Sequence, residues 1–592
     1  MTRATRLTAD RHFDARRVRR IVQRLGAEWL DPLFARRRPG AALRALIRAA
    51  APFVRVLQPN DQWSLGAFVG QWLRLLDAQP RHPLPAAKRI FMFGCYRGQF
   101  TRDLVFAVLL AWRGHRVTFG YFPKLQSPIK EPVIDAPGAS EYLRAILGPV
   151  AAQTGGRISC IDLSALAESG ENIDLAYLAS QTRADTVMRV RQEKYDPLDP
   201  ETKWALEFYG EMGRRAQRAA HNFFSRHSGD FDLCVIGNGA SFETGHFAHT
   251  ALAHGIPLTT HEKFAFSNVI VVNHGGPFFQ FTDLDRIWNR RRELGFLDGA
   301  LREFAIAKGR ELLNQRRRST GRVWGWQYQK GRPTRSPEEI EARLGVQRHK
   351  FVLVCPNVPF DAGFDGWLEL FPSMRQWLVE TVRYLLENGK WPVVVRAHPA
   401  EVRPSFDREQ IACVLAEAGI ASERLIIIPG GSDLNTYDLM PLCRYGVVFA
   451  STTGVEIAME GKPVLAGASV YYGRCGITRP ARTKTEYFES LAALDEGDDH
   501  VDPAGAEDAA MLYFMFHYLL QWRFPYDKPS QIVDCPPHRL IDHPELESYL
   551  ETLDVLAMTP DEFDQALPAL VTMDKIRRRW AWDHLWTSAS GE

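Results

Sequence analysis

Residues 392–399 read Pro-Val-Val-Val-Arg-Ala-His-Pro, and residues 446–454 read Gly-Val-Val-Phe-Ala-Ser-Thr-Thr-Gly. In each stretch a short apolar run is followed at once by polar residues, which is typical of a strand buried on both faces. The neighbouring sequence predicts strands that alternate with helices, a pattern that favours a parallel sheet covered on both faces. The strands are expected at 351–355, 392–396, 425–428, 446–449 and 463–465, and the helices at 371–387, 406–418, 436–442 and 453–460.

The N-terminal half shows the same alternation less regularly. Residues 89–93 and 117–121 predict two strands on either side of a helix, and residues 233–236 and 257–260 predict a second such pair. In parallel sheets of this kind, ligands bind at the carboxyl ends of the strands. We therefore expect an α/β fold with two Rossmann-like parallel-sheet domains that face each other across a cleft.

The domain boundaries follow from changes in pattern along the chain. The basic, Gln- and Arg-rich segment Asn314–Arg335 has few large aliphatic residues and is expected to be an interdomain linker. The expected parts are a basic helical N-terminal extension, an N-terminal Rossmann-like domain with the linker, a C-terminal Rossmann-like domain and a C-terminal helical extension. Their bounds are 1–88, 89–330, 331–500 and 501–592.

Charge and composition limit the class of protein. The 592 residues carry a net charge of only +3, which gives no support for a nucleic-acid partner. Residues 1–48, however, hold thirteen Arg and four acidic residues, which fits either a solvated helix face or an arm for an anionic membrane surface. The longest apolar stretch, 509–520, is too short for the roughly 20 residues that span a bilayer.

The eight cysteines lie far apart, with no C-x-x-C pair and no spacing suited to zinc. The N-terminus has no apolar signal segment. We expect a reduced, cytoplasmic protein, and a peripheral contact with the inner membrane remains open. The basic, Trp-rich segment 577–586 is a second candidate for such a contact, or else packs back onto the protein.

The first polar cluster is expected where the strand 392–396 ends. Arg396 can grip a phosphate or carboxylate with two parallel hydrogen bonds, and His398 can donate one. Pro399 prevents the strand from continuing. The alternative is a His at the edge of the core that is satisfied by a backbone hydrogen bond.

The second polar cluster is the hydroxyl run Ser451, Thr452 and Thr453 at the start of a helix. Free N–H groups at a helix start, together with three hydroxyls, suit a monophosphate or diphosphate. Glu456, one turn further on, can accept hydrogen bonds from ribose hydroxyls. Plain N-capping by one hydroxyl and a solvated role for Glu456 are the alternatives.

These motifs together resemble a known group. Arg-x-His-Pro, then Ser-Thr-Thr-Gly-x-Glu followed by Gly461-Lys-Pro463, then residues 467–478, are similar to the capsule polysaccharide biosynthesis family, GT-B glycosyltransferases that include β-Kdo transferases. CDP-glycerol glycerophosphotransferases and bacterial sialyltransferases share similar elements. The resemblance implies that His398 and the hydroxyl run hold the phosphate of a nucleotide-sugar donor such as CMP-Kdo, with Glu456 near the ribose. This chain departs from the family pattern at Arg474-Cys475.

The N-terminal half is expected to supply the acceptor site and the catalytic groups. Arg97 and Asn238 lie in Gly-containing turns after predicted strands and are candidates for contact with the acceptor or a phosphate. Asp103, Glu243 and Glu262 are the candidates for the base, and the sequence does not choose among them. Plain tight turns and a surface ion pair are the alternative interpretations.

The resulting prediction is a GT-B glycosyltransferase that acts on a surface or capsular polysaccharide or a lipid-linked acceptor. No cofactor is expected, because the nucleotide-sugar is a substrate, and no Asp-x-Asp pair lies near the phosphate motifs, so we expect metal-independent transfer. Two alternatives remain: a CDP-polyol phosphotransferase and a catalytically silent scaffold of a capsule assembly complex.

Overall fold

The computed structural model describes residues 73–77, 86–126, 139–168, 170, 172–263, 268–320, 328–361, 368–403, 408–497, 502–524 and 540–580. The chain forms two compact units. The first comprises Met1–Ala165 with Lys528–His543, and the second comprises Leu166–Asp527 with Pro544–Glu592. The basic segment 1–48 and the end of the Trp-rich segment, from residue 581, lie outside the described residues, so the predictions made for them stay predictions.

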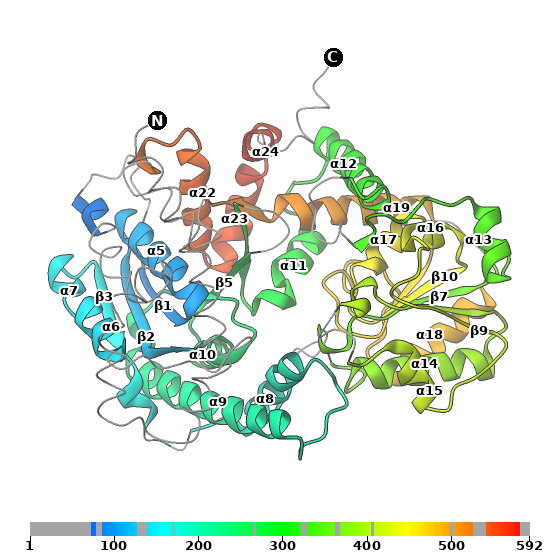
Figure 1. Ribbon diagram of the computed structural model, residues 1–592. Coiled ribbons are helices and arrows are strands. Elements are labelled where there is room, and N and C mark those ends of the chain that lie inside the picture. The colour runs from blue at the N-terminus through cyan, green and yellow to red at the C-terminus, as the bar shows by residue number, and fades with distance from the viewer. Residues whose placement is uncertain are drawn as a thin grey trace, which may run out of the picture. The chain divides into compact units, whose positions relative to one another are not determined.

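The second unit contains a five-stranded parallel sheet with the strand order β11-β10-β7-β8-β9 (Figure 1). Its strands lie almost where the sequence predicts them and are nearly all buried, because each is an apolar run with no polar face. The order reverses between β7 and β10, which opens a crevice at the carboxyl ends of these strands. The strands are β7 (Val352–Cys355), β8 (Val393–Arg396), β9 (Leu425–Ile428), β10 (Tyr445–Val448) and β11 (Val464–Ala466).

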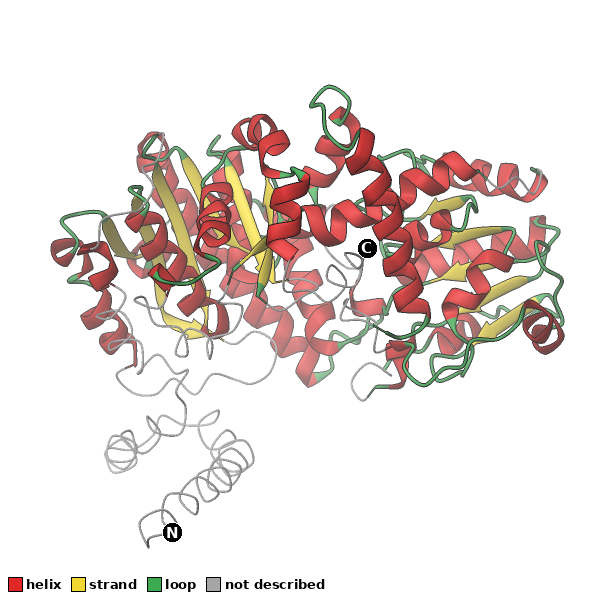
Figure 2. Ribbon diagram, turned by 90° about the horizontal axis from the view of Figure 1, so that it is seen from above, coloured by secondary structure: helices red, strands yellow, loops and turns green. Residues whose placement is uncertain are grey.

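Helices cover both faces of this sheet (Figure 2). On one face α14 (Met374–Asn388), α15 (Ile411–Glu417) and α18 (Lys484–Glu496) enclose a core centred on two fully buried aromatic residues. In that core the indole nitrogen of Trp377 donates a hydrogen bond to the Tyr487 hydroxyl at 2.7 Å. The other face is covered by α16 (Thr436–Leu439), α17 (Thr453–Met459) and α19 (Pro503–Phe514) (Figure 1).

The same unit holds the strands β4 (Leu233–Gly237), β5 (Leu258–Lys263), β6 (Val269–His274) and β12 (Gln521–Arg523), adjacent in the order β12-β6-β5-β4. β4 and β5 are parallel, whereas β6 is antiparallel to both of its neighbours. The expected C-terminal extension is therefore not only helical. It also contributes the strand β12 to this sheet, because Gln521–Arg523 is buried and pairs with the edge of β6.

Four of the other helices of this unit, α8, α9, α13 and α23, begin at a side-chain cap. The carboxylate of Asp174 accepts the N–H of Tyr177 at the start of α8, and Asp199 caps α9 in the same way. The predicted linker is partly helical, since α12 continues to Arg317. The helices are α8 (Leu175–Val190), α9 (Pro200–His227), α10 (Phe242–Ala253), α11 (Thr282–Arg290), α12 (Gly299–Arg317), α13 (Pro337–Leu344), α22 (Leu546–Leu556), α23 (Pro560–Leu570) and α24 (Met573–Trp580).

The first unit contains the parallel strands β1 (Arg89–Tyr96), β2 (Arg116–Gln126) and β3 (Ile158–Asp162), in that order. They confirm the β-α-β element predicted from residues 89–121. Its helices are α5 (Arg97–Trp112), α6 (Ala139–Leu147) and α7 (Val150–Gln153). The expected α/β architecture with parallel sheets is therefore confirmed in both units.

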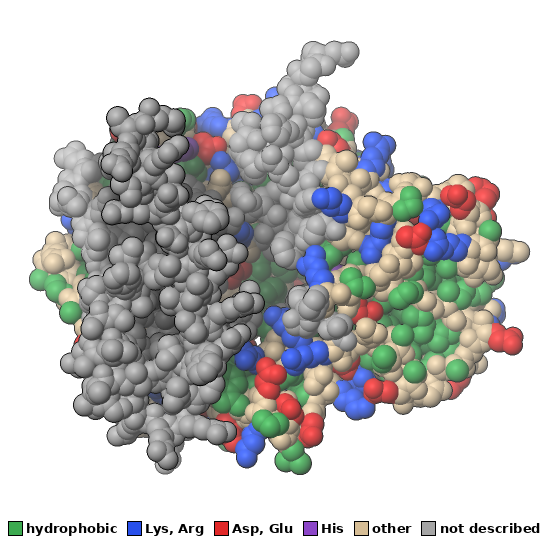
Figure 3. All heavy atoms as spheres, in the orientation of Figure 1, with side chains coloured by type: hydrophobic (Ala, Val, Ile, Leu, Met, Phe, Trp, Pro, Cys, Tyr) green, Lys and Arg blue, Asp and Glu red, His purple; other side chains and the backbone are tan. Residues whose placement is uncertain are grey.

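The C-terminal helix α24 packs inward where the structure describes it. Trp580 is fully buried, and its indole N–H donates to the Tyr518 carbonyl at 3.3 Å. This first Trp of the segment thus favours packing onto the protein over a membrane surface. None of the described helices is long and apolar enough to cross a bilayer. On the face drawn in Figure 3, acidic and basic side chains are interspersed over the described residues.

Candidate functional site

A cavity of about 410 Å³ opens at the carboxyl ends of β7, β8 and β10, within the second unit. One side of it, the strand-end wall, is made by the residues that follow these strands. The facing side, the carboxylate wall, is made by the end of β5 and a short 3-10 turn, Phe278–Gln280. The strand-end wall comprises Cys355–Val358, Arg396–Pro399, Ala450–Thr453 and Glu456, and the carboxylate wall comprises Glu262, Lys263, Phe278, Phe279 and Phe281.

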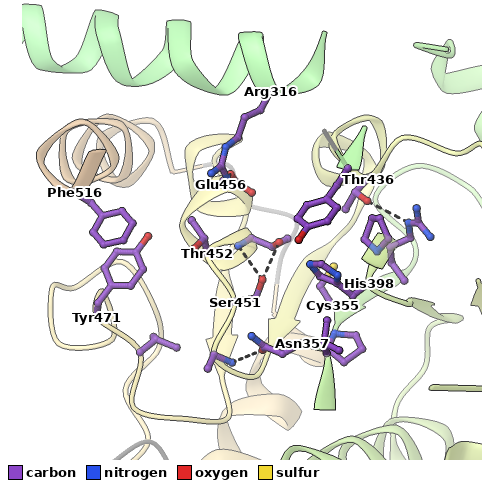
Figure 4. A pocket seen from close by; sticks show the side chains of 18 of the residues that line it. Arg316, Cys355, Asn357, His398, Thr436, Ser451, Thr452, Glu456, Tyr471 and Phe516 are labelled. Carbon is purple, nitrogen blue, oxygen red and sulfur yellow. Dashed lines mark hydrogen bonds and ion pairs between the residues drawn. The ribbon is translucent and has the colours of Figure 1, made fainter. Parts of the chain in front are cut away.

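His398 lines the strand-end wall as a neutral hydrogen-bond donor (Figure 4). Its Nδ1 accepts the N–H of Ala400 at 3.1 Å, so the ring proton must be on Nε2. Burial, helped by the nearby Arg396, lowers the pKa of His398 to about 4. The imidazole therefore offers one N–H and no charge to a ligand in the cavity at neutral pH.

The hydroxyl run lines the same cavity as His398, as the sequence predicts. Ser451 is the capping residue, because its Oγ accepts the N–H of Thr453 at 3.2 Å and its hydroxyl donates to Thr453 Oγ1 at 3.0 Å. No described residue accepts a hydrogen bond from the backbone N–H of Ser451 or Thr452. Capping thus explains the hydroxyl of Ser451. The Thr452 side chain and the backbone N–H groups of Ser451 and Thr452 are left at the cavity.

The turn after β10 is held from two sides. The amide oxygen of Asn357, beyond β7, accepts the N–H of Ala450 at 2.9 Å, and the Tyr472 hydroxyl donates to the Ser451 carbonyl. Gly454 is required for the second contact, since a Cβ there would lie 2.1 Å from the Tyr472 hydroxyl. The Gly in Ser-Thr-Thr-Gly and the second Tyr of the 467–478 stretch are therefore parts of one packed unit.

Arg396 does not have the free guanidinium that the sequence predicts. Its Nε donates to Thr436 Oγ1 at 3.2 Å, and its terminal nitrogens donate to the carbonyls of Pro429 at 2.6 Å and Leu434 at 3.3 Å. These bonds engage all three guanidinium nitrogens, and the two-bond grip on a phosphate stays a prediction. The side chain fixes the loop between β9 and α16, and its buried positive charge contributes a favourable field to the cavity.

Glu456 has contacts within the protein that the sequence did not predict, and its role at the ribose stays a prediction. It is 1% exposed and forms an ion pair with Arg316, which reaches it from α12 (Figure 4). The same carboxylate oxygen accepts the hydroxyls of Tyr513 at 2.8 Å and Tyr437 at 3.3 Å. These contacts engage one oxygen, Oε1, so Glu456 supports the wall that carries the hydroxyl run while still lining the cavity.

Glu262 lies on the carboxylate wall in a fixed orientation. Its Oε2 accepts the side-chain amide N–H of Asn238 at 3.2 Å, and its Oε1 accepts the N–H of Lys263 at 2.8 Å. Asn238 is itself fixed, because its amide oxygen accepts the N–H of Ala240 and the hydroxyl of Ser241. Asn238 is thus a support for Glu262 in this structure.

The other two candidates for the base lie elsewhere. Glu243 is 4% exposed, lines neither this cavity nor the smaller one beside α10, and has a carboxylate oxygen without a hydrogen-bond partner among the described residues. Burial raises the pKa of Glu243 to about 7. Asp103 is buried in the first unit, next to Arg102. The side chain of Arg97 lies outside the described residues.

Sequence reasoning missed several polar residues of the cavity, among them Asn357, Gln329 and Arg316. Asn357 and Gln329 have their amide oxygens engaged, by the Ala450 N–H and by Arg332, and thereby present N–H groups. Arg316 lies in the segment interpreted as a linker. Asn357 could have been found from the sequence, because it follows closely after a predicted strand. The positions of Gln329 and Arg316 at the cavity depend on tertiary contacts, which the sequence does not show.

The cavity is therefore rich in donors on the strand-end wall and carries one oriented carboxylate opposite. This arrangement suits an anion on one side and a hydroxyl group on the other. No group of three or more side chains suited to a metal ion occurs among the described residues.

Comparisons with known proteins give likeness in fold. No protein-family model matches the chain, and no curated protein matches it. The structural neighbours include KpsC, a β-Kdo 2,7-transferase of Thermosulfurimonas dismutans, which is 13% identical over 55% of this chain and 89% of that one, with a TM-score of 0.29.

Two further solved structures illustrate the range of the likeness. A UDP-N-acetylglucosamine 2-epimerase of Rickettsia bellii is 12% identical over 73% of this chain and 95% of that one, with a TM-score of 0.23. Sucrose-phosphate synthase of Thermosynechococcus elongatus is 10% identical over 72% of this chain and 93% of that one, with a TM-score of 0.23. Likenesses at this level concern the α/β fold and carry no argument about the reaction.

Proposed function

We propose that this protein is a GT-B glycosyltransferase that moves a sugar from a nucleotide-sugar donor to a hydroxyl group of a glycan or glycolipid. One observation carries the proposal: the donor-rich strand-end wall and the oriented carboxylate of Glu262 line the same cavity. A volume of about 410 Å³ falls in the range of small-ligand sites. The motif resemblance supports the same assignment from the sequence.

The strand-end wall would hold the phosphate of the donor. His398 would donate its Nε2–H, and the backbone N–H groups of Ser451 and Thr452 would supply two further hydrogen bonds. As the bond between the anomeric carbon and the phosphate oxygen breaks, the phosphate leaves with the electron pair. Preorganised donors aimed at this oxygen stabilise the charge that develops on it.

The carboxylate wall would activate the acceptor. The acceptor hydroxyl oxygen forms the new bond to the anomeric carbon, and its proton passes to Glu262. Because Asn238 and the Lys263 N–H hold the two carboxylate oxygens, little reorientation is needed for this step. Glu262 is preferred over Glu243 as the base because only Glu262 reaches the cavity.

The finer assignment follows the motif resemblance. We propose a CMP-linked sugar such as CMP-Kdo as the donor and a surface or capsular polysaccharide, or its lipid-linked primer, as the acceptor. We further propose transfer without a cofactor or metal ion in a cytoplasmic protein, with any membrane contact limited to the surface of the inner leaflet. Full loss of transfer in EDTA would contradict metal-independent transfer.

The test is a thermal-shift screen of the full chain with CMP, CDP, UDP and GDP, followed by turnover of the matching nucleotide-sugars. A ligand at 100 times its Kd stabilises the fold by about 2.7 kcal/mol, which is readily detected. We expect one nucleotide to raise Tm and its sugar derivative to be consumed. Binding without donor hydrolysis or transfer would favour the scaffold, and a phosphorylated product would favour the polyol phosphotransferase.

A further inference from the structure

The turn between α8 and α9, residues 191–199, crosses to the helices of the five-stranded sheet. Its third residue, Glu193, is 8% exposed and accepts the N–H of Met374 at 3.0 Å and the N–H of Arg375 at 2.7 Å. These are N–H groups of the first turn of α14, which have no acceptor within the helix. A carboxylate from the part of the chain that carries Glu262 thus caps a helix of the part that carries His398.

The contact is reciprocal. The backbone N–H of Glu193 donates to Oε2 of Glu409 at 2.6 Å, and Oε1 of Glu409 pairs with Arg375 at 2.8 Å. Glu417 belongs to the same network, because its carboxylate pairs with Lys194 at 2.8 Å and with Arg375 at 2.7 Å. Glu193 is thus bonded through both its side chain and its backbone.

A small apolar cluster places this contact directly behind the cavity. Val187, at the end of α8, packs with Val358, Phe360 and Ala400. Val358 lines the strand-end wall, and the N–H of Ala400 fixes the His398 ring. Tyr195 of the turn packs against this cluster, so the turn and the end of α8 together support the loop that presents the Nε2–H of His398.

The contact between the α8–α9 turn and α14 is also weak enough to open. It consists of the carboxylates of Glu193 and Glu409, a few ion pairs and a cluster of four buried apolar side chains, which is far less than a domain core. Burial, with the Glu409 carboxylate close by, raises the pKa of Glu193 to about 7. Holding the charged carboxylate there costs free energy, so this contact is less secure than a neutral core contact of the same size.

We propose that the α8–α9 turn is a clasp between the two walls of the cavity and that Glu193 is its positioning residue. The clasp holds the His398 loop in the donating geometry when closed, and it releases when the walls separate to admit substrate. Its effect on catalysis rests on the proposed function, whereas its effect on structure does not.

The first test is hydrogen exchange on the full chain without ligand, comparing Glu193→Ala and Glu193→Gln with the parent protein. We expect at least tenfold faster exchange in Glu193→Ala for peptides covering residues 374–376 and 396–403, with strands β10 and β11 unchanged. Glu193→Gln, which keeps one acceptor oxygen, should lie between them. The matched control is Glu338→Gln, which removes a surface ion pair with Arg348 that is not part of this contact and should leave exchange unchanged.

The second test separates the clasp from the function. If the parent protein binds a nucleotide, we expect Glu193→Ala to weaken its Kd about tenfold and Glu193→Gln to restore part of the affinity. Unchanged exchange at residues 396–403 in Glu193→Ala would overturn the clasp, whatever the nucleotide result. If the parent protein binds no nucleotide but Glu193→Ala still exchanges faster than the parent at residues 396–403, the clasp is confirmed and the proposed function is disfavoured.

Discussion

The two walls of the cavity present different chemical groups to a ligand. The strand-end wall relies on backbone N–H groups and a neutral imidazole, and its charged residues Arg396 and Glu456 are bonded into the protein. The carboxylate wall relies on one charged side chain, Glu262, oriented by Asn238. The comparison teaches that buried charges in this site build the walls, whereas neutral donors and one carboxylate are left for the ligand.

The largest expected effect is on the carboxylate wall. Replacing Glu262 by Gln removes the proposed base without changing the size of the side chain. General-base catalysis contributes about 10²–10⁴-fold, so kcat for transfer should fall by that factor. The nucleotide Kd and Tm should stay near the parent values. A Glu262→Gln enzyme with kcat within threefold of the parent would remove Glu262 from the mechanism.

The next effect concerns the buried ion pair behind the strand-end wall. Glu456→Gln leaves Arg316 buried without its counter-charge, and losses of this kind cost about 3–5 kcal/mol. Chemical unfolding should show this drop in the free energy of unfolding. An Arg316→Met/Glu456→Leu double variant should recover much of it. A single variant as stable as the parent would mean that Glu456 is free for a ligand after all.

A smaller effect is expected from the support of Glu262. Asn238→Asp keeps the acceptor oxygen for Ala240 but replaces the amide donor by a second carboxylate beside Glu262. A like charge raises the pKa of its neighbour, so the acid limb of the kcat profile should move to higher pH. We also expect kcat at the optimum to fall about tenfold. If the acid limb of the kcat–pH profile of Asn238→Asp lies at the same pH as in the parent protein, Asn238 does not act through Glu262.

The smallest effect on transfer is expected at Glu243. Burial raises its pKa to about 7, so the folded state binds more protons than the unfolded state between about pH 4.5 and 7. Stability should therefore decline as pH rises through this window. Glu243→Gln should flatten that decline and leave transfer unchanged. Loss of transfer in a folded Glu243→Gln protein would return this residue to the list of candidate bases.

The sequence was sufficient where local pattern decides the structure. Apolar runs placed the strands of the five-stranded sheet almost to the residue, and the polar residues after them located His398 and Ser451–Thr453 in one cavity. It failed where a distant residue decides the role of a side chain. Glu456 could not be assigned because its partner Arg316 is 140 residues away, in a segment whose basic composition indicated a linker.

The most direct test of the central claim compares a nucleotide with its nucleoside on the parent protein and His398→Ala. Calorimetric titration should show that the variant loses about 10–100-fold in affinity for the nucleotide, the value of a hydrogen bond to a charged group of about 1.5–3 kcal/mol. Its affinity for the nucleoside should not change. Equal losses for both ligands, or no loss for either, would contradict a phosphate site at the strand-end wall.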